Sequence, residues 1–276
     1  MVRVIIIYIS TNILNKDILL DMYNHFKHAI PKEFTKIYEY DNSDGRALQL
    51  ALREDSPEFH QALKFAESQN LAYRLFSDVH YTKKEIDNCQ YFQLYIMKDV
   101  LELEGTYLTH YGTKYEDRCE QCGFGGTLAG DALIDRKFMR KAVLGLAVPE
   151  YFVCEDLKNA IEDSGLTGLK FEHEIKDYKG RDMPKYYVMS FQNVLPPLSE
   201  STWLNVYSTE ECGHSIIYLQ SDLQYEKEKL ADAMDFNITA ERVNNDKMPE
   251  IVISAKARKF LQANRIFCRY IPVALL

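Results

Sequence analysis

The sequence of 276 residues lacks the features that mark several large protein classes. It has no stretch of roughly 18 apolar residues, the length that a membrane-spanning helix needs. Its six cysteines are too few and too unevenly spaced for a disulfide scaffold. It contains no GxSxG elbow and no HExxH helix, and the glycine-rich run 123–130 has no Lys–Ser/Thr end. These absences disfavour a membrane protein, a serine hydrolase, a zinc protease and a phosphate-loop nucleotide-binding protein.

The chain also lacks an excess of positive charge. Lys and Arg number 33 against 41 Asp and Glu, which gives a formal net charge of −8. Because phosphate contacts require Lys and Arg, we expect no nucleic-acid partner. An acidic surface suits a basic protein partner instead.

The first residues bear on the cellular compartment of the chain. The apolar run Val4–Ile9 is short, the polar segment TNILNKD follows it, and no small-residue cleavage site is present. A buried first strand is therefore favoured over a signal peptide. Together with the sparse cysteines, this predicts a cytoplasmic, reduced protein with no membrane partner.

The periodicity of apolar residues alternates between strand and helix patterns without the regularity of a barrel, which favours an α+β fold with mixed or antiparallel sheets and flanking helices. Strands are expected at 2–10, 35–40, 71–77, 91–97, 185–191 and 215–219, and helices at 16–29, 55–70 and 224–234. Ser56 is expected to cap the second of these helices, with Pro57 in its first turn.

Composition divides the chain into three parts. We expect an N-terminal α+β domain over 1–111, a polar, glycine-rich connector over 112–131 and a C-terminal α+β domain over 132–276. The C-terminal part contains two weakly similar units, 151–174 and 251–273, and each has the pattern of a strand, a helix and a strand. Chance recurrence of this punctuation explains the similarity equally well.

The sharpest local motif is CEQCG at Cys119–Gly123 in the connector. Two thiolates at this spacing can reach one metal ion, and the following glycine allows the backbone to turn around it, as in a zinc knuckle. Two reduced cysteines in a glycine-rich turn are the simpler alternative. A redox pair is disfavoured, because the glycines that follow oppose the helix that such a pair requires.

A structural zinc ion needs two further ligands, usually Cys or His. The run TEECGH supplies Cys212, followed by glycine as Cys122 is, and His214. We therefore predict a zinc site formed by Cys119, Cys122, Cys212 and His214, with His110 as an alternative fourth donor. A catalytic zinc with three cysteine ligands and one open position is the alternative, with Glu120, Glu211 or His214 as its general base.

Two further features bear on a binding function. Eight acidic residues lie in 222–250 against four basic ones, and an acidic face there would steer a basic partner, although an ordinary soluble surface is the simpler explanation. Trp203 belongs to the core or to a partner contact, and the core is the favoured interpretation.

The order of these motifs resembles a known group of proteins. A Gly-Thr run leads into the CxxCG knuckle, the strand YFVC and the helix segment DLKNAIEDSGLTGLKFE follow, and a later Cys-Gly turn precedes a final ISAKARKFLQ helix and a closing strand. Over roughly residues 110–275 this resembles the bacterial double-CxxCG motif proteins and related immunity-protein families of polymorphic toxin systems. Thr209 stands where the first cysteine of the second knuckle would be, which leaves three cysteines with His214 as a substitute.

The resemblance implies an intracellular binding protein, specifically an immunity protein that neutralises a toxin by direct protein–protein contact. Its partner would be a basic toxin domain. This interpretation is favoured over the zinc-dependent enzyme and over a metal-stabilised structural domain, because the chain is acidic, the sequence offers no catalytic constellation and the resemblance implies binding.

Overall fold

The computed structural model describes residues 2–11, 16–31, 46–96, 108–139, 143–209, 211–243 and 248–276. The strand predicted at 35–40 lies outside these residues. Within them, no helix is both long enough and apolar enough to cross a membrane. The fold is α+β, as the sequence predicts, with antiparallel and mixed sheets and flanking helices.

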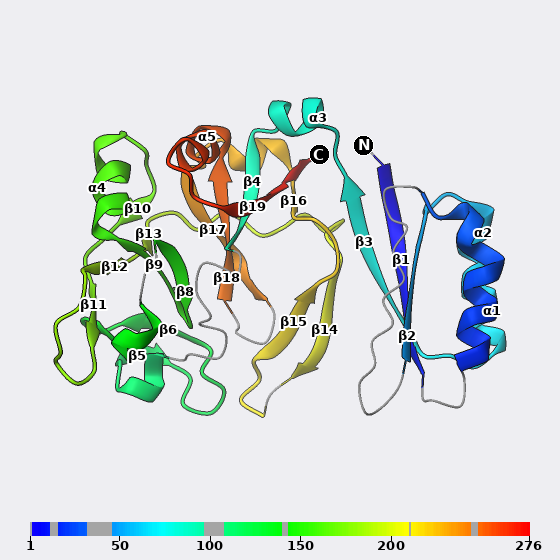
Figure 1. Cartoon of the computed structure of the whole chain (residues 1–276), viewed down its shortest axis with the longest axis horizontal. Coiled ribbons are helices and arrows are strands. Elements are labelled where there is room, and N and C mark those ends of the chain that lie inside the picture. Colours follow the sequence, from blue (N-terminus) through cyan, green and yellow to red (C-terminus); the bar gives the residue numbers. More distant parts are fainter. Residues whose placement is uncertain are drawn as a thin grey trace. The chain divides into compact units, whose positions relative to one another are not determined.

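The chain forms two compact units, of which the first comprises Met1–Asn88 with Gln220–Asp222. Its elements are β1 (Val2–Thr11), α1 (Lys16–Phe26), η2 (Lys27–Ala29), β2 (Arg46–Leu52), α2 (Pro57–Ser68), β3 (Tyr73–His80) and α3 (Lys83–Asn88). The antiparallel sheet has the order β2-β1-β3, and α1 and α2 cover one of its faces (Figure 1). Alternate residues Ile5, Ile7 and Ile9 of β1 are buried beneath them, as the period of a strand requires.

The predicted cap of α2 is confirmed. The Ser56 side chain accepts a hydrogen bond from the Phe59 N–H at 3.2 Å, and Pro57 occupies the first turn. One of the N–H groups that the first helical turn leaves without a backbone partner is thereby satisfied.

The second unit comprises Cys89–Leu219 and Leu223–Leu276. Its larger sheets are β17-β18-β4-β19 and β7-β11-β12-β9-β8. The strands of these sheets are β4 (Tyr91–Ile96), β17 (Phe236–Val243), β18 (Met248–Ser254), β19 (Cys268–Pro272), β7 (Ala132–Ile134), β8 (Leu144–Ala147), β9 (Glu150–Cys154), β11 (Glu174–Asp177) and β12 (Tyr186–Val188). The helices are α4 (Glu155–Asp163), α5 (Ala255–Ala263) and the short 3-10 helices η5 (Leu108–Tyr111), η6 (Arg136–Phe138) and η7 (Lys227–Leu230).

The division between the units falls after residue 88, whereas the sequence places it at 111. The reason is β4, which lies between β18 and β19 and forms hydrogen bonds with both. Because two C-terminal strands need β4 to complete their sheet, it belongs to the second unit. The expected connector 112–131 likewise lies inside that unit.

Both similar segments have the expected strand, helix and strand, but they are used differently. The second runs β18, α5, β19 within one sheet, where both strands are antiparallel to β4 and hence parallel to each other. In the first, β9 belongs to the five-stranded sheet, whereas β10 (Leu169–Lys170) pairs with β13 (Ser190–Phe191).

The helix predicted at 224–234 is wrong in part. Residues Gln224–Tyr225 form β16, which pairs in parallel with β20 (Ala274–Leu275), and only Lys227–Leu230 is helical, as η7. Tyr225 is fully buried, and burying its side chain in the core outweighs the local helix propensity.

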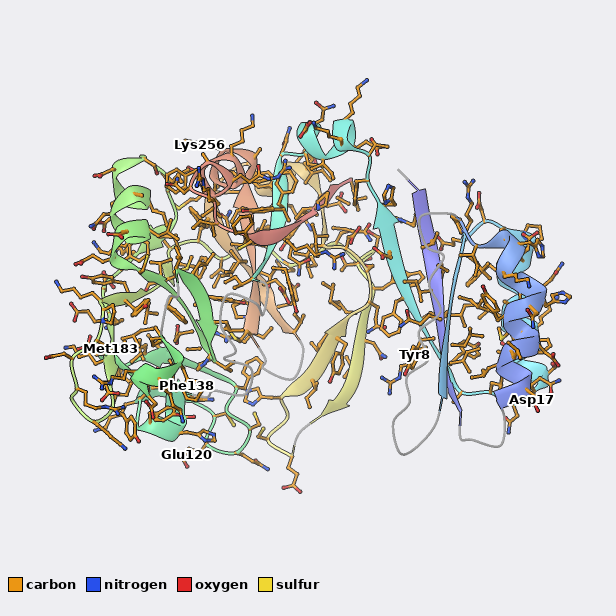
Figure 2. All side chains as sticks on the ribbon, viewed as in Figure 1. Tyr8, Asp17, Glu120, Phe138, Met183 and Lys256 are labelled. Carbon is orange, nitrogen blue, oxygen red and sulfur yellow. The ribbon has the colours of Figure 1, made fainter. Side chains whose placement is uncertain are left out.

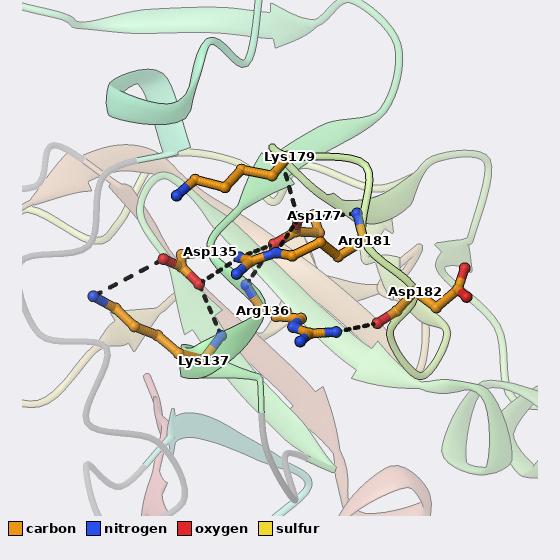
Figure 3. Close-up of polar contacts among 7 residues, drawn as sticks. All are labelled: Asp135, Arg136, Lys137, Asp177, Lys179, Arg181 and Asp182. Atoms are coloured by element: carbon orange, nitrogen blue, oxygen red, sulfur yellow. Dashed lines mark hydrogen bonds and ion pairs between the residues drawn. The ribbon is translucent and has the colours of Figure 1, made fainter.

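A polar cluster fastens the loop after β11 to η6 (Figure 3). The Asp177 carboxylate, 0% exposed, accepts hydrogen bonds from the backbone N–H groups of Arg136 at 3.0 Å, Lys179 at 3.0 Å and Arg181 at 3.1 Å. The Arg181 guanidinium also donates to it at 2.6 and 2.8 Å and to Asp135 at 3.0 Å. The Arg181 side chain, with these N–H donors, holds the pKa of Asp177 well below its usual range.

Candidate metal centre

Two hairpins of the second unit carry the cysteines of interest. The first consists of β5 (Tyr115–Arg118) and β6 (Gly125–Leu128), and the second of β14 (Leu204–Thr209) and β15 (Ser215–Leu219). The turn of each hairpin contains a Cys-Gly pair. Figure 1 shows the two turns near each other at the lower edge of this unit, and Figure 2 labels Glu120 in the first turn.

The backbone of the first turn folds as a knuckle. The Cys119 N–H donates to the Phe124 carbonyl at 2.9 Å, and the Gly123 N–H donates to the Cys119 carbonyl at 2.8 Å. Gly123 has a φ of +70°, which a residue with a side chain rarely adopts. These bonds turn the chain within one loop, so that Cys119 and Cys122 project to the same side.

Arg118 braces this turn from inside the hairpin. Its Nε donates to the Gly123 carbonyl at 3.0 Å, and its guanidinium lies 5.0 Å from the centroid of the Tyr115 ring. Gly126 has a φ of +96°, and a Cβ at that position would lie 2.8 Å from the Arg118 Cβ. The glycines that follow the CxxC motif therefore allow the chain to turn and allow Arg118 to pack closely against it.

The second turn brings Cys212 and His214 to the same place. Gly213 between them has a φ of +83°, and the exposed Gln121 side chain donates to the Glu211 carboxylate at 3.1 Å, which links the two turns directly. The structure therefore brings together all four residues that the sequence predicts as ligands.

The four ligand atoms form one compact group. The Sγ atoms of the three cysteines and a ring nitrogen of His214 all lie within 4.8 Å of one another, and each residue is half-buried. The His214 Nδ1 lies 3.3 Å from the Sγ of Cys122 and 3.3 Å from the Sγ of Cys212. Ligands about 2.3 Å from a tetrahedral ion lie about 3.8 Å apart, so these four atoms have the spacing that a metal ion requires. The group could hold a metal ion.

Neighbouring side chains fix the orientation of the His214 ring. The Phe124 ring stacks on it with centroids 4.3 Å apart and planes 11° apart. The guanidinium of Arg242, in β17, lies 5.6 Å from the centroid of the same Phe124 ring. The stack directs Nδ1 toward the thiols, so Nδ1 is the ring nitrogen suited to bind the ion.

The thiols of the group differ in acidity. A backbone hydrogen bond from Cys122 is the largest of the contributions that lower the pKa of Cys119, to about 6. A backbone hydrogen bond from His214 lowers the pKa of Cys212, but burial and hydrogen bonds with Cys122 and Cys119 raise it further, so the net direction is upward. One thiolate is therefore present near neutral pH to receive a metal cation.

Other sequence candidates lie elsewhere in the described chain. His110 is in η5 and is not part of the four-residue group that the structure brings together. Thr209 lies in β14, before the turn. The sequence did not reveal Phe124 or Arg242 as neighbours of the site; the aromatic residue directly after the CxxCG motif is a local signal, but Arg242 comes from a distant strand and leaves none.

A partly buried carboxyl group lies near the hairpin β5–β6. Burial raises the pKa of Glu150 to about 7, although Tyr115, Arg242 and Arg118 act in the opposite direction. The structure therefore places a carboxyl that titrates near neutral pH among the residues that brace the knuckle.

No family model matches the chain, and no curated protein matches it.

Proposed function

We propose that the Cys3His group binds zinc and that the chain is a zinc-stabilised protein-binding protein. The observation that carries the proposal is the convergence of four ligand atoms within 4.8 Å from two separate hairpins. Three thiolates and one imidazole form a soft donor set that suits Zn²⁺ better than Mg²⁺ or Ca²⁺, which prefer oxygen ligands. Zinc would join the hairpins β5–β6 and β14–β15.

The donor set favours a structural ion over a catalytic one. A catalytic zinc keeps one position open for water, whereas His214 here lies 3.3 Å from two of the three sulfurs and supplies a fourth ligand. Of the general bases considered from the sequence, Glu120 and Glu211 are exposed, and Glu211 accepts a hydrogen bond from Gln121. A zinc enzyme therefore has less support than a structural zinc site.

The metal can be tested on the purified full-length chain. We expect one zinc per chain and, after cobalt substitution, the intense visible absorption of tetrahedral cobalt thiolate. The double variant Cys119→Ser, Cys122→Ser should lose both, while Cys89→Ser, outside the group, should keep both. A chain that purifies without metal and takes up no cobalt would contradict the proposal.

The binding activity is proposed as that of an intracellular immunity protein that neutralises a basic toxin domain by direct contact. The net charge of −8 and the resemblance to immunity-protein families support it. Affinity capture of the tagged chain from its own cells should yield one stoichiometric, basic partner, and the purified chain should suppress that partner's toxicity. Capture of no stoichiometric partner by the zinc-loaded chain would count against this activity.

A further inference from the structure

The hairpin β14–β15 has an outer edge on β14. Within the described residues of the second unit, β14 forms strand hydrogen bonds only with β15, so no described strand of that unit pairs with its second edge. Natural proteins guard such edges with lysine, with proline or with a β-bulge, because an open edge recruits another strand. The strand Leu204–Thr209 contains neither Lys nor Pro, and the register shifts only after Val206, so the stretch from Leu204 to Val206 has none of these guards.

Large apolar side chains are exposed on this strand. Val206 is 57% exposed and Leu204 38% exposed, and the register places Ile217 opposite Val206 and Leu219 opposite Leu204 on the same face. Trp203 directly before the strand is the only tryptophan of the chain and is 37% exposed, so the core position favoured by the sequence is wrong. Exposed tryptophan and aliphatic residues in one short segment are typical of a binding surface.

The sequence on both sides of this strand carries charge of one sign. No Lys or Arg occurs over residues 186–226, which contain five acidic residues. Glu200 before the strand and Glu211 after it are both exposed. The outer edge of β14 thus carries apolar side chains in its middle and negative charge at both ends.

The stretch 222–250 is a weaker candidate for a partner surface. Two of its described acidic residues form hydrogen bonds within the fold: the carboxylate of Asp235 accepts hydrogen bonds from Ser254 at 2.6 Å and from the Thr167 N–H at 3.1 Å, and that of Glu250 accepts one from Gln93 at 2.9 Å. Charge at these positions serves the fold of the second unit.

We propose that the outer edge of β14 binds an extended segment of a partner protein that has apolar residues in its middle and Lys or Arg at its ends. The segment would add a strand to the hairpin, so that main-chain hydrogen bonds give affinity and the charged ends give selectivity. The inference rests on the proposed binding function and assigns its surface. Metal bound by Cys212 and His214 would hold the turn of this hairpin, so the edge would be ordered before the partner arrives.

The test selects peptides of about ten residues, the length of a long strand, from a random displayed library on the zinc-loaded full chain. We expect enriched peptides to alternate apolar residues between basic ends. Val206→Arg should weaken their binding at least about tenfold, because it replaces an apolar contact with a charge of the partner's sign. Val194→Arg is the matched control: Val194 is 58% exposed and introduces the same charge, and binding should change less than about twofold.

Strand pairing has a separate readout. Methylating the backbone nitrogens of one alternate set of peptide residues should abolish binding, while methylating the other set should not, because only one set faces the edge. Enrichment of no peptide, enrichment of acidic peptides, or equal binding by the two variants would overturn the proposal. Self-association of the free chain that Val206→Arg abolishes would assign the edge to a second copy and would also overturn it. A stoichiometric basic partner captured with equal yield by the Val206→Arg chain would leave the proposed function standing and refute only this surface.

Discussion

Replacing Gly168 by alanine should destabilise the second unit far more than replacing Gly165, although both glycines lie in the same SGLTG segment after α4. Both have positive φ, +99° at Gly168 and +66° at Gly165, so each alanine incurs roughly 1–2 kcal/mol of backbone strain. A Cβ at Gly165 meets no atom within 4 Å, whereas a Cβ at Gly168 would lie 2.0 Å from the carbonyl oxygen of Phe236.

The overlap at Gly168 has no flexible side chain to absorb it. Phe236 is 1% exposed and its N–H donates to the Thr167 carbonyl at 3.0 Å, while the Gly168 carbonyl accepts from Gln192 at 3.0 Å. Moving either backbone strains both bonds, and overpacking of this kind costs about 1–3 kcal/mol. We therefore expect Gly168→Ala to lose roughly 2–5 kcal/mol and Gly165→Ala roughly 1–2 kcal/mol.

The single tryptophan makes the assay specific. Trp203 belongs to the second unit, so its fluorescence during urea unfolding of the zinc-loaded chain follows the unit that contains both glycines. Equal losses of unfolding free energy in the two variants would refute the argument, because they would show that positive φ alone accounts for the glycine at 168.

Three further predictions use the same fluorescence assay. Asp177→Asn should cost about 1–3 kcal/mol at pH 7, because buried N–H donors and the Arg181 guanidinium lose a charged acceptor. Since folding lowers the pKa of Asp177, the stability advantage of the wild type should shrink and disappear as the pH falls below about 4. A difference in stability that does not depend on pH would be the contrary result. Ser254→Ala should cost about 1 kcal/mol, because the Ser254 hydroxyl caps α5 through the Ala257 N–H at 3.1 Å, and an unchanged midpoint would show that the cap contributes nothing. Glu150→Gln should match the wild type in stability at pH 4 and exceed it at pH 8. The Glu150 carboxyl, with its pKa raised to about 7, binds a proton more tightly in the folded chain, so its ionisation destabilises the fold as the pH rises. A wild type that is more stable than the variant at pH 8 would contradict the raised pKa.

The composition of the four-residue group was predictable from the sequence because each half of it is local. Cys119 with Cys122, and Cys212 with His214, lie on single turns next to glycines that allow the required φ, and a zinc site demands that the halves meet. The partners that orient the site were not predictable. Arg242 reaches Phe124 from β17, and only the folded sheet brings them together.

Strands too were predictable where the signal is local and not where it depends on distant partners. β1 and β15 were predictable from alternating or continuous apolar residues, whereas β14 was not predicted, because its apolar residues are exposed and mixed with polar ones. The position of β4 between two C-terminal strands likewise depends on pairing partners far along the chain. Local pattern identifies an element, but its sheet neighbours decide the unit to which it belongs.

The hairpins that carry the Cys3His group explain what a metal ion would contribute to this part of the chain. β5 and β6 are short and pair only with each other in the described residues, as β14 and β15 do, and an isolated two-stranded hairpin is marginally stable in water. Among the described residues, Leu128 and Leu219 anchor them to different core clusters, and the two turns meet through the stack of Phe124 on His214. Gln121 with Glu211 is an exposed contact and adds little. Zinc between the turns would add a stronger link, because the binding free energy of a structural ion is folding free energy for the segments that ligate it. The same link would fix the turn of β14–β15 beside the proposed binding edge, so the proposed metal site would order the proposed binding surface.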